Sequence, residues 1–208
     1  TQELNRELGN VDIYLLDQIL KGRYHTGMKI LDAGCGEGRN LIYFLNNGFD
    51  VHGIDQNPEA IRLLRFIIGS KYPYCSKENF NIGPVESMDF ANESFDLIIS
   101  SAVLHFANSH DQFKTMFAEM IRVLRSTGQL FIRMTSNIGL NISKEKEDTG
   151  CFFLPDGSLR YLITRELIIE LLREYNLELI EPIKTANVDD LRCMTTLVLS
   201  KKYCHLLH

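Results

Sequence analysis

The chain has 208 residues and a formal net charge of −5, with 45% hydrophobic and 24% charged residues. These proportions are typical of one globular domain with a substantial core. The acidic balance and the lack of a long Lys/Arg run argue against a nucleic-acid interface, and no apolar stretch approaches the roughly 20 residues that span a bilayer.

Five cysteines, at positions 35, 75, 151, 193 and 204, are an odd number without C-x-x-C spacing. This pattern predicts neither a disulfide framework nor a zinc site, so we expect no metal. The chain begins at Thr1 without a basic-then-apolar leader, which argues against secretion. We therefore expect a cytoplasmic protein without a membrane partner.

The first recognisable element is an amphipathic helix over residues 11–21, because its apolar residues recur at helical spacing. Residues 28–40 then read as a buried strand, a glycine-rich turn and the start of a second helix. The turn holds Gly34, Gly36 and Gly38 directly after Asp32. Glycines let the backbone approach a ligand closely, and the following helix N-terminus offers unpaired N–H groups to an anion.

A second strand–helix unit follows. Residues 49–55 form a short apolar strand that ends in Asp55, and Asn57-Pro58 predicts a helix start. A repeated strand–helix order indicates a parallel α/β sheet. An acid at the end of the second strand is where such folds bind a ribose, because one carboxylate accepts two hydroxyl hydrogen bonds. Taken by itself, Asp55 is also compatible with a plain helix-capping role, but the glycine turn before it favours a ribose ligand.

The later elements continue this order. Strands are expected at residues 79–82, 94–100 and 129–134, with a long helix over 109–125 between the last two. Residues 135–160 are irregular in pattern and carry a charged cluster at 144–148, and such a stretch is functional or disordered. A helix begins at Thr164, and residues 177–185 and 193–200 read as two strands joined by a turn at Asp189-Asp190.

Four signals in this order resemble the class I S-adenosylmethionine-dependent methyltransferases. They are D-x-G-x-G-x-G at 32–38, the acid after the second strand, Phe95-Asp96 entering an apolar strand, and the C-terminal hairpin. The Gly-Glu-Gly-Arg-Asn form at 36–40 is similar to the tellurite-resistance-like, small-molecule branch. The resemblance covers residues 28–200 and implies one domain over 1–208. Its implied fold is a Rossmann-like α/β domain: a seven-stranded, mostly parallel sheet with helices on both faces and an antiparallel C-terminal strand.

The resemblance also implies S-adenosyl-L-methionine as cofactor and a small-molecule acceptor. Residues 83–90 match the segment that binds adenine in this family, but Pro84 stands where the family usually has an Asp. The adenine contacts then come from the backbone of Val85 or the carboxylate of Glu86. The cofactor-binding residues that we expect are Asp32, Gly34, Gly36, Arg39, Asp55, Gln56, Val85, Glu86 and Ser100.

His105 follows the fourth strand in a Leu-His pair typical of the family. Because histidine titrates near neutrality, it either acts as the base that deprotonates the acceptor, or has no chemical role and packs on the cofactor or caps a helix. The helix at 11–21 and the insertion at 135–160 are the segments expected to cover the site, with Arg133 and Arg160 close to the two ends of the insertion. Two other interpretations stay open: a nicotinamide-dependent oxidoreductase, and a non-catalytic partner subunit with the methyltransferase fold.

Overall fold

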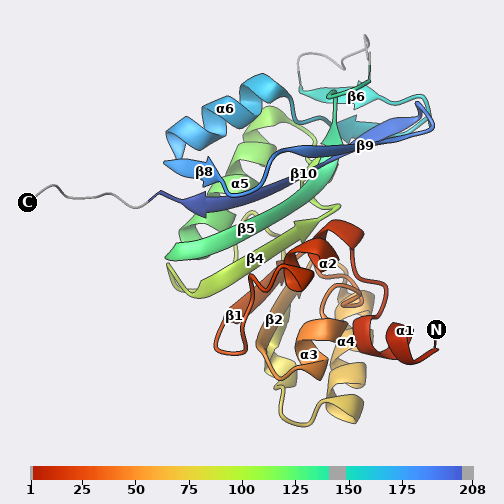
Figure 1. Ribbon diagram of the computed structural model, residues 1–208, viewed down its shortest axis with the longest axis vertical. Coiled ribbons are helices and arrows are strands. Elements are labelled where there is room, and N and C mark those ends of the chain that lie inside the picture. Colours follow the sequence, from red (N-terminus) through yellow and green to blue (C-terminus); the bar gives the residue numbers. More distant parts are fainter. Residues whose placement is uncertain (1, 141–148, 203–208) are drawn as a thin grey trace, which may run out of the picture.

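The computed structural model describes residues 2–140 and 149–202, which build one large sheet with helices against it (Figure 1). The sheet has eight strands, and seven of them follow the order β3-β2-β1-β4-β5-β10-β8, while β9 pairs with β10. Their bounds are β1 Lys29–Ala33, β2 Asp50–Asp55, β3 Phe80–Ile82, β4 Phe95–Ser101, β5 Leu124–Ser136, β8 Leu177–Leu179, β9 Lys184–Val188 and β10 Arg192–Lys201.

The strands β3, β2, β1, β4 and β5 are parallel, and β10 runs antiparallel to β5. The prediction of a Rossmann-like, mostly parallel sheet with an antiparallel C-terminal strand is therefore confirmed. The strand count differs, because the strand expected over 177–185 is split into β8 and β9. Pro182 lies in the gap, and proline has no N–H to donate to a ladder. The long β10 pairs with β8 at its end and with β9 near its start.

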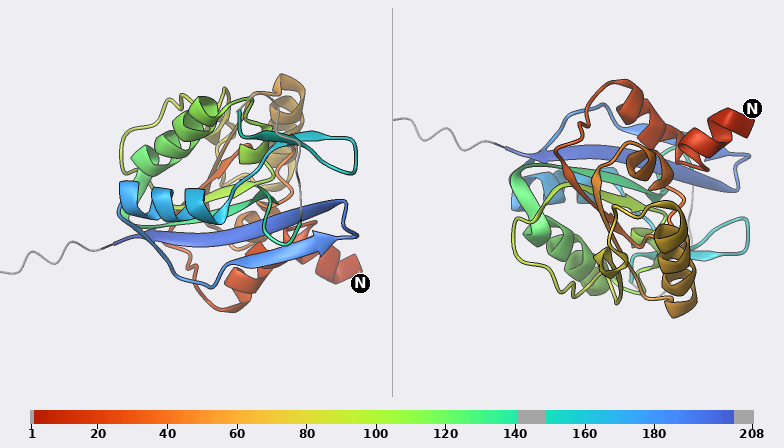
Figure 2. Two further views of the ribbon diagram at one scale, coloured as in Figure 1. Left: turned by 90° about the horizontal axis from the view of Figure 1, so that it is seen from above. Right: turned by 90° about the horizontal axis from the view of Figure 1, so that it is seen from below.

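Helices cover both faces of the sheet, as predicted, and each face buries its own apolar cluster. On one face lie α2 (Ile13–Leu20), α3 (Ile42–Asn46) and α4 (Pro58–Lys71), with α1 (Gln2–Leu8) against α3. On the other face lie α5 (His110–Val123) and α6 (Arg165–Glu174). Figure 2 shows α5 and α6 on the side of the sheet opposite α2.

Helix starts follow the capping residues in the sequence. The side chain of Asn57 accepts hydrogen bonds from the backbone N–H groups of Glu59 and Ala60, at 3.0 and 3.4 Å. Helix α2 is shorter than the helix expected over residues 11–21. It begins after Asp12, whose side chain caps it by accepting a hydrogen bond from the N–H of Tyr14 at 2.9 Å.

The insertion at 135–160 is more regular than expected. It contains an antiparallel hairpin of β6 (Cys151–Phe153) and β7 (Leu159–Tyr161). Its turn holds Pro155-Asp156-Gly157, and Gly157 has φ +81°. A P-D-G sequence favours such a turn, because proline presets one backbone angle and glycine accepts a positive φ. The prediction of an irregular segment is wrong for these residues, and the charged cluster at 144–148 lies outside the described residues.

Candidate active site

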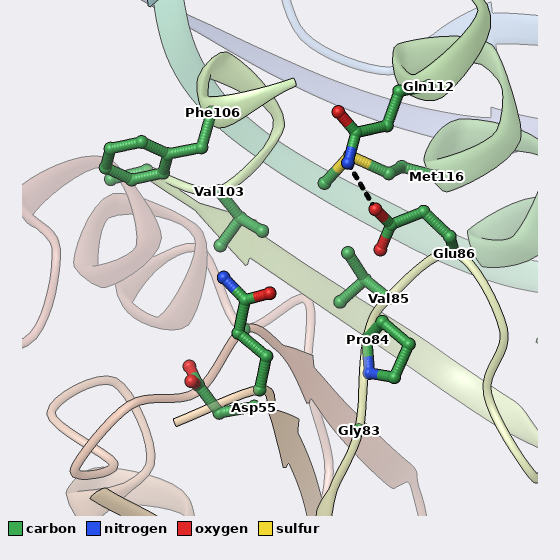
Figure 3. A pocket seen from close by; sticks show the side chains of 12 residues that line it. Asp55, Gly83, Pro84, Val85, Glu86, Val103, Phe106, Gln112 and Met116 are labelled. Atoms are coloured by element: carbon green, nitrogen blue, oxygen red, sulfur yellow. Dashed lines mark hydrogen bonds between the residues drawn. The ribbon is translucent and has the colours of Figure 1, made fainter. Parts of the chain in front are cut away.

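A cavity opens beyond the carboxyl ends of the parallel strands, and we call it the first cavity. In Figure 3, Asp55 stands at one end of it and Gln112 and Met116 of α5 at the other. Val103 and Phe106 line one side, and the segment from Gly83 to Glu86 lines the opposite side. Ligands bind at this edge of parallel α/β sheets because the loops that follow the strands converge there. Five predicted site residues meet here: Gly34, Asp55, Gln56, Val85 and Glu86.

The Asp55 carboxylate organises the glycine loop. Its Oδ2 accepts a hydrogen bond from the N–H of Gly36, and its Oδ1 accepts one from the N–H of Asn57, both at 2.8 Å. One side chain at the end of β2 thus fixes the loop after β1 and the turn into α4. Each carboxylate oxygen keeps a second lone pair, so the same group can still accept hydroxyl hydrogen bonds from the cavity side.

Two glycines of the loop are needed for different physical reasons. Gly34 has φ +87°, and a Cβ there would lie 2.4 Å from Cγ2 of Val103, so the fold itself requires glycine. Gly36 has φ +52°, but a Cβ there would meet no atom within 4 Å. The open space beside Gly36 leaves room for a ligand to approach the backbone.

Asp32 is nearly inaccessible and does not line the first cavity, and neither of its carboxylate oxygens has a hydrogen-bond partner in the described residues. Burial raises the pKa of this carboxyl to about 7, while Arg39 opposes the rise and Asp55 adds to it. A buried acid without a partner is costly, so the site favours a cationic or hydrogen-bond-donating group next to Asp32. This unmet requirement suits the ammonium group of an amino-acid ligand.

The predicted residues Arg39 and Ser100 do not line the first cavity either. Arg39 is exposed, and its Nη2 donates to Oγ of Ser101 at 3.1 Å. Oγ of Ser101 donates in turn to Oδ2 of the buried Asp12, which also accepts from Nη1 of Arg133 at 2.7 Å. Arg39 therefore belongs to a polar network that ties the start of α2 to β4 and β5. Ser100 is fully buried in β4, and its hydroxyl has no partner in the described residues.

The adenine-side segment follows its expected course despite Pro84. Val85 is buried, and the exposed ring of Pro84 lies on the cavity wall. The Glu86 carboxylate accepts a hydrogen bond from Nε2 of Gln112, as the dashed line in Figure 3 shows. The sequence patterns gave no reason to expect Gln112 and Met116 here, because they matter only through the packing of α5 over the cavity.

His105 lies outside the first cavity and lines a neighbouring one, which we call the second cavity. Burial lowers the pKa of His105 to about 4, with Arg160 and Arg192 adding to the effect. The imidazole is therefore neutral at physiological pH. Nδ1 lies 3.4 Å from the N–H of Thr135 and accepts from it, an arrangement that places the ring proton on Nε2. In this tautomer His105 presents a donor, not a basic lone pair.

The second cavity lies between β4–β5 and the two hairpins, β6–β7 and β9–β10. Figure 2 shows both hairpins projecting beyond the same end of the sheet, and Nη1 of Arg192 joins them by an ion pair with Asp156 at 3.3 Å. Ala102, which has φ +63°, lines both cavities. The sequence analysis did not single out Arg192 or Asp156 as site residues. The Pro-Asp-Gly turn signal would have placed Asp156 in a turn. The lining residues are Ala102, His105, Arg133, Thr135, Leu154, Asp156, Ser158, Arg160, Val188, Arg192 and Met194.

Three further observations on the described ranges concern metal binding, membrane-spanning helices and the cysteines. Within residues 2–140 and 149–202, no three His, Cys, Asp or Glu side chains are grouped so that they would hold a metal ion. None of the helices in those ranges combines the length and apolarity needed to cross a bilayer. Cys35, Cys75, Cys151 and Cys193 are all reduced and buried.

Comparison with known proteins finds similarity to methyltransferases. Residues 31–132 match the family described as a methyltransferase domain. The chain is 32% identical over 107 residues to a phthiotriol/phenolphthiotriol dimycocerosates methyltransferase of Mycobacterium leprae, covering 50% of this chain and 37% of that protein. It is 39% identical over 83 residues to a probable S-adenosyl-L-methionine-dependent methyltransferase, TehB, of Haemophilus influenzae, covering 38% and 27%. The chain thus spans less than two fifths of either relative.

A solved structure agrees in fold. The 1,6-didemethyltoxoflavin-N1-methyltransferase of Burkholderia thailandensis, with bound 1,6-didemethyltoxoflavin and S-adenosylhomocysteine, superposes with a TM-score of 0.68 at 18% identity, covering 97% of this chain and 82% of that one. The predicted resemblance to S-adenosylmethionine-dependent methyltransferases is confirmed, including the similarity to the tellurite-resistance-like (TehB) branch. The matches agree with S-adenosyl-L-methionine as cofactor, and they support neither the oxidoreductase nor the non-catalytic interpretation.

Proposed function

We propose that this chain, whose residues 31–132 match the family described as a methyltransferase domain, transfers a methyl group from S-adenosyl-L-methionine to a small-molecule acceptor. The observation that carries the proposal is the buried Asp32 carboxylate beside the glycine loop, whose two oxygens have no hydrogen-bond partner among the described residues. A ligand with an ammonium group and a ribose would satisfy both Asp32 and Asp55. A nicotinamide dinucleotide offers hydroxyls to Asp55 but carries no ammonium group for Asp32.

The cofactor roles divide along the first cavity. Asp55 accepts hydrogen bonds from the ribose hydroxyls, and Gln56 lies beside it on the wall. Gly34 and Gly36 allow the backbone to approach the ligand. Val85 and Glu86 would flank the adenine, and Asp32, which lies behind the glycine loop and outside the cavity lining, would stabilise the ammonium group from there. Arg39 and Ser100 support this arrangement from outside the cavity.

When bound, S-adenosyl-L-methionine supplies an electrophilic methyl group on a sulfonium, so the chain needs no nucleophile of its own. The protein's contribution is to hold two reactants in line, which is worth about 7–11 kcal/mol at its ideal limit. Ala102 lines both cavities, so the methyl group and the acceptor would meet beside it. The low pKa of His105 makes it a weak base, so we assign it no role in deprotonating the acceptor. Instead, His105 donates a hydrogen bond from Nε2 toward the acceptor and helps to exclude water.

We also propose that residues 1–208 form a single methyltransferase domain, with α2 and the β6–β7 hairpin as its coverings. Its partners are small molecules, with neither nucleic acid nor membrane among them. The eight-stranded sheet, with a buried apolar cluster on each of its faces, supports this extent.

The test is calorimetry with S-adenosyl-L-methionine, S-adenosylhomocysteine and NAD, followed by an assay of S-adenosylhomocysteine release across a metabolite panel. We expect micromolar binding of the two adenosyl ligands, a binding free energy of about −8 kcal/mol, and no comparable binding of NAD. Preference for NAD would overturn the proposal. Binding without release across the panel would point instead to a non-catalytic role.

A further inference from the structure

The second cavity carries more positive than negative charge. Among the described residues, its lining includes Arg133, Arg160 and Arg192, against one carboxylate, that of Asp156. Its volume is about 300 Å³, which suits a small molecule. A cavity with excess positive charge favours an anionic ligand, because its low-dielectric walls strengthen the attraction.

Two of the three arginines already have carboxylate partners. Arg133 pairs with the buried Asp12, at 2.7 Å between Nη1 and Oδ2. Arg192 pairs with Asp156 at 3.3 Å, a looser contact at a half-exposed position. These pairs neutralise most of the charge that the two arginines bring to the cavity.

Arg160 differs from both. Its Nη1 donates to the carbonyl oxygen of its neighbour Leu159 at 2.7 Å, and its guanidinium lies over the ring of Phe106, 4.8 Å from the centroid. No carboxylate in the described part of the chain forms an ion pair with it. Stacking on an aromatic ring fixes the plane of a guanidinium and leaves its outer edge available for a planar two-oxygen partner.

Phe106 also connects the two cavities. Its ring lines the first cavity and supports Arg160, which lines the second. An anionic group bound at Arg160 would therefore lie next to the boundary that Ala102 shares between the cavities. The rest of the second cavity offers the apolar side chains of Leu154, Val188 and Met194 to a small organic body.

We propose that the methyl acceptor is a small organic anion and that Arg160, assisted by Arg192, binds its oxyanion group in the second cavity. The inference rests on the proposed function, which it deepens by naming the acceptor's chemical class. Either a carboxylate or a phosphate group supplies the required oxyanion. Arg160 acts as a positioning residue: it holds the acceptor beside the first cavity and touches no reacting atom.

The test uses protein saturated with S-adenosylhomocysteine and three probes of similar shape: benzoate, phenyl phosphate and benzamide. We expect at least one anionic probe to bind, at least about tenfold more tightly than the neutral benzamide. Arg160→Gln should weaken binding of that anion at least about tenfold. Comparing the two anions shows which oxyanion the site prefers.

Arg165→Gln is the matched control, because Arg165 is exposed at the start of α6 and does not line the second cavity. It removes the same charge and should leave anion binding unchanged. The inference is overturned if benzamide binds as well as the anions, if Arg160→Gln binds them like the wild type, or if neither anion binds below about 10 mM. Affinity for S-adenosylhomocysteine, measured first in each variant, reports on the proposed function separately. If that ligand does not bind, the same titrations on ligand-free protein still decide the anion site.

Discussion

Asp55→Ala is the most informative single change, because Asp55 serves both the apo structure and the proposed ribose site. Its carboxylate accepts two backbone hydrogen bonds at 2.8 Å. Removing them from a half-buried position should cost about 2 kcal/mol of folding stability. For a protein of this size that is a fall in melting temperature of about 4–8 °C.

The effect on cofactor binding should be larger. Ribose hydroxyls lose a charged acceptor, which is worth about 2–4 kcal/mol, and this corresponds to about 30- to 1000-fold weaker binding. Calorimetric titration with S-adenosylhomocysteine measures the affinity, and thermal unfolding of the same samples measures stability. Both readouts are needed, because a loop that has lost its anchor would weaken binding without any contact to ribose.

Asn57→Ala is the control for that indirect effect. The side chain of Asn57 caps α4 through the N–H groups of Glu59 and Ala60, and it does not line the first cavity. Loss of the cap should cost about 1 kcal/mol of stability and leave affinity unchanged. If Asp55→Ala and Asn57→Ala bind S-adenosylhomocysteine equally well, Asp55 is a structural residue only and the ribose assignment is refuted.

Three further outcomes are expected. Gly36→Ala should weaken S-adenosylhomocysteine binding at least about tenfold. Gly48 also has positive φ and an open Cβ position, so Gly48→Ala should lose about as much folding stability as Gly36→Ala but keep the wild-type affinity. Equal affinities in the two variants would refute the close approach of the ligand at Gly36. Because burial raises the pKa of Asp32 to about 7, the ligand-free protein should lose stability as pH rises from about 4 through 7, when the unfolded chain but not the native one has released the proton. Asp32→Asn should flatten that slope, and S-adenosyl-L-methionine binding near pH 6 should release protons in calorimetry with buffers of different ionisation enthalpy; no release would separate Asp32 from the cofactor. Because the pKa of His105 lies near 4, the pH profile of turnover should contain no titration between pH 6 and 7 that depends on His105. A titration in that range that disappears in His105→Gln would identify His105 as the base.

Local patterns in the sequence were sufficient for the alternation of strands and helices, the glycine loop and the start of α4. Each of these depends on neighbours within a few residues: Asn57 caps its own helix, and alternation of strand and helix restricts the sheet to a parallel arrangement. The acid at the end of the second strand was found in the same way. Its position at the first cavity follows from topology, because the carboxyl ends of parallel strands share one edge.

The second cavity could not be predicted from local sequence patterns. The Asp12–Arg133 pair joins residues 121 positions apart, and the Arg192–Asp156 pair joins two hairpins. Such contacts leave no periodic or spacing signal, since they depend on how the chain packs after the sheet has formed. The partnerless carboxylate of Asp32 and the lowered pKa of His105 are likewise consequences of burial. The sequence alone predicted a cofactor site after the first two strands, while tertiary packing decided the charge of the second cavity, because burial and long-range pairing set which of the described side chains pair with each other.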